Sequence, residues 1–393
     1  MHPTRTICIT LSLALAFLAA CDRDTPAAAT PAATAPAAAP PPGHAGTISV
    51  CNWSDYIGKD TLAAFEAKTG LQVDYCNYAN NDALLERLKA SPRAYDVVFP
   101  TAVPYARDLV ADGRLAELDK RLLPNLSHLD PAIMAELAES DPGNAHLIPY
   151  MWGTTGLGVN VDRVRAALGP SAPLDSWGLL FDPANAAKLS KCGIGVLESS
   201  LDAVPPALFW KGMDPRDFSD GANDTVHAVY DAIRPHIRKF ENGNDLIAGL
   251  ANGNYCLVLT YSGDVQQARA RAAEQATKGG GKAPDIRYVI PREGAIRWID
   301  TIAIPKDAPH PEAALRFMNH LMDPAVIAAI SDEVAYANAN TDATPLVDKA
   351  IAGDPGIYPP AAVRAKLANA GRPDEAQAKA RKRAWDLIVY GSL

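Results

Sequence analysis

The sequence lacks the short motifs that mark common hydrolases, metalloenzymes and nucleotide-binding proteins. Its 393 residues contain no Gly-x-Ser-x-Gly turn, no His-Glu-x-x-His helix and no phosphate-binding loop. The glycine-rich run 153–158 has neither the lysine nor the spacing of a nucleotide loop. The eight histidines are scattered, without metal-ligand spacing. We therefore expect no catalytic residues, no metal and no cofactor.

Basic residues are in the minority. The chain has 37 Lys and Arg against 45 Asp and Glu, a formal net charge of −8 at pH 7. This balance argues against nucleic-acid binding and is compatible with a cationic ligand. We interpret the basic cluster at 379–383 as a solvated helix face. After residue 20, no apolar stretch is long enough to span a bilayer as a helix.

The first 46 residues have the composition of an export signal followed by a tether. Arg5 precedes an apolar run over 7–20 that ends in Leu-Ala-Ala before Cys21. This resembles a bacterial lipobox, which implies removal of residues 1–20, lipid attachment to Cys21 and a periplasmic protein anchored at a membrane. The alternative is an ordinary signal peptide cleaved elsewhere. Residues 21–46, mostly Ala, Pro and Thr, cannot build a core and are expected to form an extended tether.

Few cysteines remain for the folded part. Loss of the signal and lipidation of Cys21 leave four, and an oxidising compartment allows these to pair. Three pairings are possible. We favour a disulfide between Cys192 and Cys256, and leave open whether Cys51 bonds to Cys76, although these two fall on neighbouring expected strands. The absence of Cys-x-x-Cys spacing argues against a redox motif or a zinc knuckle.

From residue 47 the sequence alternates between short apolar segments and amphipathic ones. Repeated β-α-β units of this length predict a mainly parallel sheet with helices on both faces. The length of this part of the chain predicts two domains, and open α/β sheets bind ligands at strand ends. The expected strands span 47–52, 71–76, 95–100, 154–159, 194–197, 256–261 and 286–290, and the expected helices 60–68, 82–90, 104–111, 162–167 and 312–321.

Acidic and aromatic residues recur together at the ends of expected strands. The groups are Trp53 with Asp55 and Tyr56, Tyr261 with Asp264, Trp298 with Asp300, and Tyr336 before a polar run. Ring faces attract an organic cation and cover its methylenes, while carboxylates neutralise its ammonium groups. The alternative is that the two tryptophans are core aromatics and that the aspartates cap helices or form turns. We favour a binding site for a flexible organic cation.

Seven motifs, in order and with similar spacing, resemble the bacterial polyamine-binding proteins, the extracytoplasmic receptors of putrescine and spermidine import systems. They are N-W-S-D-Y-I at 52–57, P-Y-M-W-G-T-T-G at 149–156, D-S-W at 175–177, S-G-D-V at 262–265, P-x-E-G-A at 291–295, Y-A-N-A-N at 336–340 and P-G-I-Y-P-P at 355–360. The resemblance covers about residues 47–370, favours the putrescine-binding branch, and implies the type II periplasmic-binding fold, two discontinuous α/β lobes around a ligand cleft. We assign 47–149 plus 275–330 to the N-terminal lobe and 150–274 plus 331–393 to the C-terminal lobe.

The resemblance also implies which residues bind the ligand. The positions that match the family are Trp53, Ser54, Asp55, Tyr56, Asp264, Asp300 and Tyr336. Four positions depart from its pattern: Tyr261 replaces a tryptophan, Thr101 replaces a serine, Asp202 aligns imprecisely with an acidic position, and Trp298 stands where putrescine-preferring members carry Phe and spermidine-preferring ones Trp. These departures leave the preferred polyamine open.

The function implied is capture of putrescine or spermidine and its delivery to the permease subunits of an ABC importer. We expect a monomer without enzymatic activity that touches the membrane only through its lipid anchor. One alternative is a polyamine sensor that engages a membrane signalling partner. Another is a receptor for a different organic cation, such as a longer polyamine, agmatine or a quaternary amine. An exported enzyme acting on amines would need a cofactor motif that the sequence lacks.

Overall fold

A computed structural model describes residues 46–371 and 373–391. The predicted signal peptide, the predicted lipidation site Cys21 and the predicted tether up to residue 45 lie outside these residues. The described part forms a mixed 11-stranded sheet in the order β2-β1-β3-β9-β4-β7-β5-β6, with β8 and β10 added to β4 and β11 added to β9. The strands are β1 (Thr47–Trp53), β2 (Gln72–Tyr78), β3 (Val97–Val98), β4 (Leu147–Asn160), β5 (Ile194–Leu197), β6 (Lys239–Glu241), β7 (Leu257–Tyr261), β8 (Ile286–Val289), β9 (Ala295–Ala303), β10 (Ala337–Asn338) and β11 (Leu367–Ala368).

The sheet has two parallel halves joined by two antiparallel strands. In the first sheet half, β1 pairs in parallel with β2 and β3, and in the second, β5 pairs in parallel with β6 and β7. Strands β4 and β9 run antiparallel to each other. The chain passes into the second half along β4 and returns along β9, so these two strands must run in opposite directions. The predicted parallel pairing therefore holds for the halves, whereas the centre is antiparallel.

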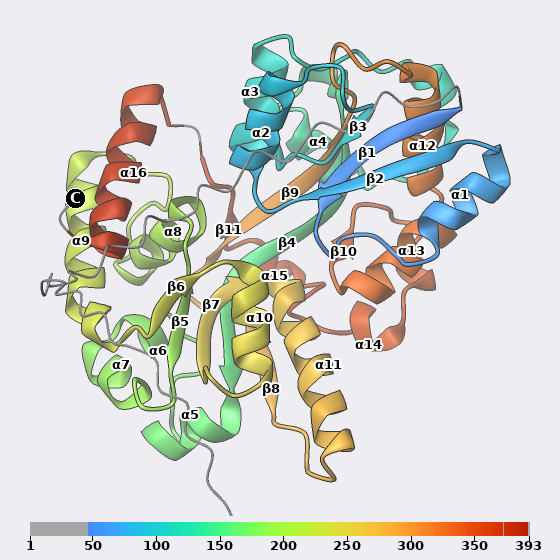
Figure 1. Cartoon of the computed structure of the whole chain (residues 1–393). Coiled ribbons are helices and arrows are strands. Elements are labelled where there is room, and N and C mark those ends of the chain that lie inside the picture. Colours follow the sequence, from blue (N-terminus) through green and yellow to red (C-terminus); the bar gives the residue numbers. More distant parts are fainter. Residues whose placement is uncertain (1–45, 372, 392–393) are drawn as a thin grey trace, which may run out of the picture. The chain divides into compact units, whose positions relative to one another are not determined.

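Helices surround both sheet halves (Figure 1). Helices α1 to α4, α12 and α13 lie around the first half, and α5 to α10 and α16 around the second. The helices are α1 (Thr61–Thr69), α2 (Asn81–Ala90), α3 (Arg107–Ala111), α4 (Pro131–Leu137), α5 (Val161–Leu168), α6 (Gly178–Phe181), α7 (Pro183–Leu189), α8 (Ser200–Trp210), α9 (Asp220–Ile233), α10 (Gly243–Ala251), α11 (Ser262–Lys278), α12 (Pro311–Leu321), α13 (Pro324–Val334), α14 (Lys349–Ala352), α15 (Ala361–Arg364) and α16 (Glu375–Tyr390).

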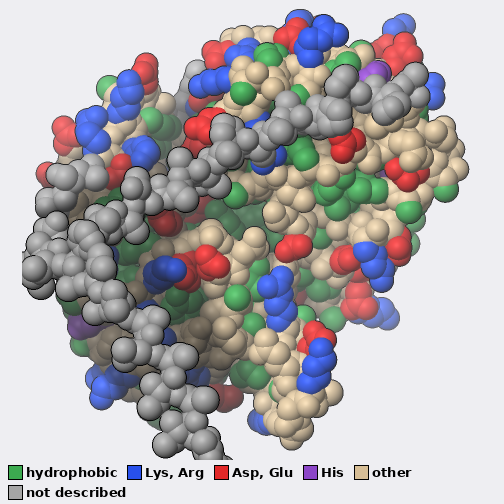
Figure 2. All heavy atoms as spheres, in the orientation of Figure 1, with side chains coloured by type: hydrophobic (Ala, Val, Ile, Leu, Met, Phe, Trp, Pro, Cys, Tyr) green, Lys and Arg blue, Asp and Glu red, His purple; other side chains and the backbone are tan. Residues whose placement is uncertain are grey.

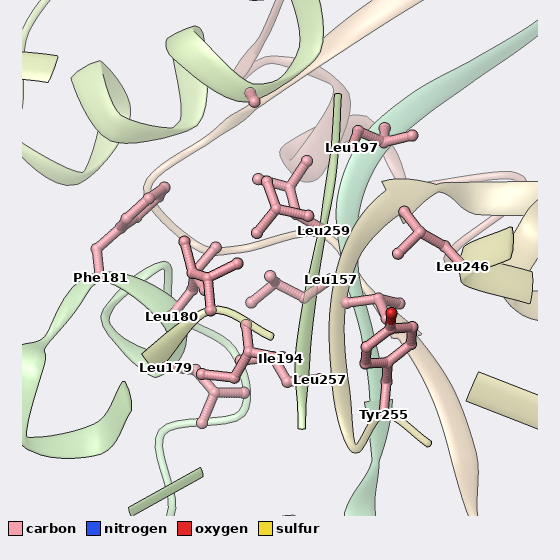
Figure 3. Close-up of a cluster of buried hydrophobic side chains, with 14 of the residues drawn as sticks. Leu157, Leu179, Leu180, Phe181, Ile194, Leu197, Leu246, Tyr255, Leu257 and Leu259 are labelled. Atoms are coloured by element: carbon pink, nitrogen blue, oxygen red, sulfur yellow. The ribbon is translucent and has the colours of Figure 1, made fainter. Parts of the chain in front are cut away.

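Separate hydrophobic clusters lie under the two halves. In the second half, Leu157 of β4 lies in one cluster with Leu257 of its neighbour β7 and Ile194 of the next strand, β5 (Figure 3). Trp385 of α16 belongs to the same cluster. In the first half, Phe65 of α1 packs in a buried cluster with residues of β1 and α12. All 14 residues of β4 are buried. A strand that is covered on both faces gains stability from apolar side chains at every position. Strand β4 is therefore a buried central strand that both sheet halves share.

Two disulfides tie neighbouring strands together. Cys192 bonds to Cys256, as predicted, and this links the segments that lead into the parallel neighbours β5 and β7. Cys51 bonds to Cys76, the pairing that the sequence left open. These two residues are opposite each other in the β1–β2 register, which brings their side chains to the same point of the sheet.

The basic cluster at 379–383 is only partly a solvated face, so the prediction was wrong for Arg381. Lys379 and Lys382 are exposed and pair with acids one turn away on α16. Arg381 is buried, with its guanidinium 4.1 Å from the ring centroid of Phe218 and a hydrogen bond to the backbone carbonyl of Asp217. The attraction of a guanidinium for an aromatic face offsets part of the cost of burying its charge.

Candidate ligand-binding site

Most of the acidic and aromatic residues singled out in the sequence lie together where the two sheet halves join at β4 and β9, whereas Trp53 and Asp55 do not contact the rest among the described residues. The residues that lie together follow the ends of β1, β3, β5 and β7, lie on β9 itself, or immediately precede β10. The carboxyl ends of the parallel strands in both halves therefore face the same region, which is the usual place for a ligand in an open α/β sheet.

Asp300 occupies the centre of this region on β9. Its carboxylate accepts a hydrogen bond from the Tyr56 hydroxyl at 2.9 Å and another from the Thr101 hydroxyl at 2.6 Å. Asn81, at the start of α2, donates to the Thr101 hydroxyl at 3.0 Å and fixes its orientation. Because Asp300 is buried, each of its oxygens depends on these donors or on a ligand.

Asp264 lies in the first turn of α11 and has the same kind of surroundings. The Tyr336 hydroxyl donates to it at 2.8 Å and the Thr260 hydroxyl at 3.0 Å. The close approach of Tyr336 requires glycine at 263, because a Cβ there would lie 2.4 Å from the tyrosine ring. The Ser-Gly-Asp motif thus places the acid and the ring against each other.

Asp202, in the first turn of α8, repeats the pattern a third time. The Tyr261 hydroxyl donates to its carboxylate at 2.8 Å, and the Thr155 hydroxyl of β4 donates at 2.9 Å. Ser199, the N-cap residue of α8, adds a third donor at 2.7 Å. Although Asp202 aligned imprecisely with the family pattern, it joins the same network as Asp264 and Asp300.

Four aromatic rings connect the three acids. The ring centroids of Tyr261 and Trp298 are 5.7 Å apart, those of Trp298 and Tyr336 are 5.4 Å apart, and those of Tyr336 and Tyr56 are 5.4 Å apart. All three contacts are edge-on, so the rings do not cover one another's faces. Each tyrosine holds a different aspartate, so rings and acids form one connected unit, which we call the acid–ring network: Tyr56, Thr101, Asp202, Tyr261, Asp264, Trp298, Asp300 and Tyr336.

A cation beside the three aspartates of the network would stabilise their ionised forms. Burial raises the pKa of Asp300 to about 7 and that of Asp264 to about 6, although the hydroxyl donors lower both. Burial also raises the pKa of Asp202, whose negative charge in turn raises the pKa values of the other two. Like charges held close together in a dry site disfavour their ionised forms, and a cation placed among them would relieve this.

The first-strand loop contributes less to the network than the resemblance implies. Ser54 and Asp55 are exposed, and Asp55 faces the Arg271 guanidinium of α11 at 3.9 Å. Trp53 is half-buried beside Tyr78, with its indole nitrogen donating to the Phe99 carbonyl at 2.8 Å. Ligand contacts by Trp53, Ser54 and Asp55 stay a prediction.

Four supporting residues were not predicted from the sequence, and only one of them carried a recognisable signal. Thr155 and Thr260 hold carboxylates from within strands, where threonine is common and carries no signal of its own. Ser199 stands three residues before Asp202, a spacing typical of helix N-termini that could have been recognised. Arg271 falls in a polar helix without a distinguishing motif.

Among residues 46–371 and 373–391, no group of three or more His, Cys, Asp and Glu side chains is arranged to hold a metal ion. In the same residues, no helix has both the length and the apolar character needed to cross a membrane.

Comparison with known proteins places these features in a family. Residues 60–359 match the family described as bacterial extracellular solute-binding protein. The chain is 43% identical over 344 residues to the putrescine-binding periplasmic protein SpuD of Pseudomonas aeruginosa. The matched region covers 88% of this chain and 92% of that protein. It is 42% identical over 348 residues to the putrescine-binding periplasmic protein PotF of Escherichia coli, with the same two shares, 88% and 92%.

A solved structure supports the fold independently. A protein described as a putative spermidine/putrescine ABC transporter from Listeria monocytogenes superposes with a TM-score of 0.75 at 24% sequence identity, over 88% of this chain and 100% of that chain. The superposition confirms the predicted α/β fold of the type II periplasmic-binding class.

Proposed function

The chain belongs to the bacterial extracellular solute-binding proteins, and from this we propose that it is a polyamine receptor that captures putrescine or spermidine for an ABC importer. The observation that carries the proposal is the acid–ring network. Three aspartates accept hydrogen bonds from tyrosine and threonine hydroxyls while four rings stand between them. A carboxylate that already accepts hydrogen bonds from hydroxyls still carries a negative charge, which an ammonium group can neutralise. The faces of aromatic rings bind cations and cover methylenes.

In the proposed complex, the methylenes of the ligand lie along the rings of the network. Asp264 and Asp300 take one ammonium group, and Asp202 takes the other together with the first-strand loop at Ser54 and Asp55. The hydroxyl donors keep the three carboxylates in place without neutralising them, so the negative charge stays available for the ligand.

The size of the ligand makes nearly every contact necessary. Putrescine has six heavy atoms, and at a ceiling of ~1.5 kcal/mol per atom its binding free energy reaches about 9 kcal/mol. Micromolar affinity already requires about 8.2 kcal/mol. A desolvated ammonium group without a partner would cost several kcal/mol, so one acid alone would not suffice. The repeated acid, tyrosine and threonine arrangement meets this requirement.

We further propose that the two sheet halves act as lobes that close on the ligand about β4 and β9. Hinge closure around a ligand is a known behaviour of periplasmic binding proteins. The 3.9 Å pair between Asp55, beside β1, and Arg271, on α11, would hold the closed lobes together. The exact lobe boundaries inferred from the sequence stay a prediction.

The proposed setting is the periplasm, with the protein lipidated at Cys21 and presenting its closed form to permease subunits. The role is binding and release without chemical change, in keeping with the binding proteins that the chain resembles. The export signal predicted at 1–20 supports this setting.

A thermal-shift panel tests the proposal directly. Putrescine, cadaverine, spermidine, spermine and agmatine would be added separately to the purified protein, with a neutral diol of the length of putrescine as the control. We expect at least one amine to raise the melting temperature, since a ligand that binds only the folded state stabilises it. A panel without any shift would contradict a polyamine receptor.

A further inference from the structure

The P-G-I-Y-P-P motif at 355–360 contributes no side chain to the acid–ring network, yet the chain there contacts elements that carry the network. We call residues 354–358 the brace. They lie between α14 and α15, and Figure 1 shows both helices close to α11 and β4. The brace therefore lies beside the junction of the two sheet halves.

The first contact of the brace is with α11. The carboxylate of Asp354 accepts a hydrogen bond from the Gln266 amide at 2.8 Å, and the Arg269 guanidinium is 3.5 Å from the same oxygen. Gln266 stands two residues after Asp264, the acid of the network on α11. Side chains two residues apart on a helix point to different sides. Asp354 therefore contacts α11 on a side other than the one that presents Asp264 to Tyr336.

Gln266 depends on Asp354 for its hydrogen bonding. The glutamine is 5% exposed, and its amide oxygen has no hydrogen-bond partner among the residues that the structure describes. Asp354 is the one partner of this side chain within 46–371 and 373–391. A buried amide that loses its partner carries the full cost of desolvation. The carboxylate of Asp354 therefore fixes where Gln266, and with it the start of α11, can lie.

Asp354 also fixes the turn that leads to the second contact. Its carboxylate accepts the backbone N–H of Gly356 at 2.8 Å, and its backbone carbonyl accepts those of Ile357 and Tyr358 at 3.0 and 2.9 Å. A Cβ at Gly356 would lie 2.9 Å from the ring of Tyr288 on β8, so the turn packs directly against that strand. One residue thereby sets the geometry between the two contacts of the brace.

The second contact of the brace is with β10. The Tyr358 hydroxyl accepts the backbone N–H of Asn338 at 3.3 Å, and its ring lies edge-on to that of Trp152 on β4, with the centroids 6.4 Å apart. Asn338 stands two residues after Tyr336, whose hydroxyl donates to Asp264. The brace therefore contacts both elements that meet in this hydrogen bond, α11 through its first residue and β10 through its last.

We propose that Asp354 is a positioning residue for the ligand site, which holds α11 and β10 at the separation at which Tyr336 donates to Asp264. The role rests on the proposed function and adds a residue to it. Asp354 does not touch the ligand and acts through Gln266 and the turn of the brace. Because a carboxylate that its donor no longer orients meets an ammonium group less favourably, loss of Asp354 should weaken binding without abolishing it.

The effect of the charge of Asp354 has to be separated from the effect of its position. Figure 2 shows acidic and basic side chains interspersed over the face that carries α11 and α14, rather than a patch of one sign. Asp354→Ala and Asp354→Asn remove the same charge, but Asn keeps an oxygen that can accept from Gln266. Isothermal titration with putrescine, at a temperature where the variants are folded, compares both with the parent protein. We expect Asp354→Ala to weaken binding about threefold to tenfold, the scale of one hydrogen bond, and Asp354→Asn to stay within about twofold of the parent.

A double-mutant cycle with Tyr336→Phe tests the route of the effect. This change removes the hydroxyl that donates to Asp264. Changes at residues without shared partners multiply in affinity to within about twofold. If Asp354 acts through this hydrogen bond, Asp354→Ala should weaken binding less than about twofold in the Tyr336→Phe background. Gln266→Met breaks the same contact from α11 and should behave alike, and it replaces Asp354→Ala in the cycle if that variant does not fold.

The outcomes separate the positioning role from the function on which it rests. Support would be a loss of affinity in the variants that break the Gln266 contact, together with losses in the cycle that do not multiply. Unchanged affinity of Asp354→Ala or Gln266→Met, equal losses for Asp354→Ala and Asp354→Asn, or losses that multiply with that of Tyr336→Phe would each overturn the role and leave the receptor function in place. If the parent protein binds no polyamine, the proposed function falls and the positioning role with it.

Discussion

The three aspartates of the site share one local design. Each carboxylate accepts a hydrogen bond from one tyrosine hydroxyl and another from one threonine hydroxyl, although the three acids lie on α8, on α11 and on β9. Neutral donors orient a carboxylate but leave its charge in place. Buried negative charge without a cation is unfavourable, and this is the physical basis for the affinity that we propose.

Removing one of these charges should weaken binding strongly. For Asp264→Asn and for Asp300→Asn, we expect putrescine affinity to fall at least tenfold, because a desolvated ammonium group loses its charged partner. Calorimetric titration of both variants measures the affinity for putrescine, with Glu117→Gln, a change at an exposed residue outside the acid–ring network, as the control. Affinities equal to that of the control in both variants would show that these acids do not contact the ligand.

Affinity should also depend on pH. The pKa values of about 7 for Asp300 and about 6 for Asp264 are those of the empty site, and an ammonium group would lower both. Binding near neutral pH should therefore release protons, and affinity should rise between pH 5 and 8. Titration in two buffers of different ionisation enthalpy at pH 6.5 detects the released protons, and identical heats in both would argue against the linkage.

The stability of the empty protein should change in the opposite direction. A free aspartate has a pKa of about 3.9, so between roughly pH 4 and pH 7 the folded state binds more protons at Asp264 and Asp300 than the unfolded state does. The contribution of both carboxyl groups to the free energy of unfolding is fully present below pH 4 and is lost as pH rises through 6 and 7. Melting curves of parent and Asp300→Asn, compared across this window, should converge at low pH. Parallel curves would contradict the raised pKa.

The residues of the site could be predicted to different degrees. The acids and rings stand out because charged and aromatic residues at strand ends have few structural uses together, and Asp202, Asp264 and Asp300 lie in one network with the tyrosines. Thr155 and Thr260 could not be predicted, since a strand threonine is equally suited to packing. Asp55 matches the family motif, yet its left-handed backbone, with φ at 53°, leaves its side chain exposed toward Arg271.

Helix α11 links the acid–ring network to the loop that follows β1. It carries Asp264 in its first turn and Arg271 two turns later, and Arg271 faces Asp55. The sequence did not indicate this helix, because its core-facing side is built from small residues such as Ala268 and Ala272 amid polar ones. Such a narrow, weakly apolar stripe gives little helical periodicity.

We expect Asp55 and Arg271 to stabilise the closed form as a pair. Arg271→Gln alone removes both an attraction to Asp55 and a repulsion of the cationic ligand, so the single change is ambiguous. A double-mutant cycle with Asp55→Asn isolates the pair, and its coupling should be about 0.2–1 kcal/mol in putrescine affinity, vanishing at high salt. Zero coupling at low salt would show that the pair does not contribute to closure.

The central strands show where prediction from sequence failed at the level of elements. Only 154–159 of β4 was predicted, whereas the strand starts at residue 147, because a strand buried on both faces has no polar alternation to mark its extent. In β9, Arg297 and Asp300 interrupt the apolar run. Charged residues within an otherwise apolar strand obscure the local pattern, and one of the two, Asp300, belongs to the candidate site.

At the scale of the whole molecule, the proposal requires movement of the two sheet halves about β4 and β9. Small-angle scattering should show a smaller radius of gyration when putrescine is added. The Asp264→Asn, Asp300→Asn double variant, given the same putrescine concentration, should keep the larger value. Equal radii for the parent protein with and without ligand would argue against closure.

Calorimetric titration of ligand-free protein with putrescine and spermidine measures whether the acid–ring network holds one elongated organic cation. We expect one molecule bound per chain with micromolar or tighter affinity for at least one of them. The absence of binding to any aliphatic di- or triamine under conditions where the protein is folded would show that the network does not hold such a cation.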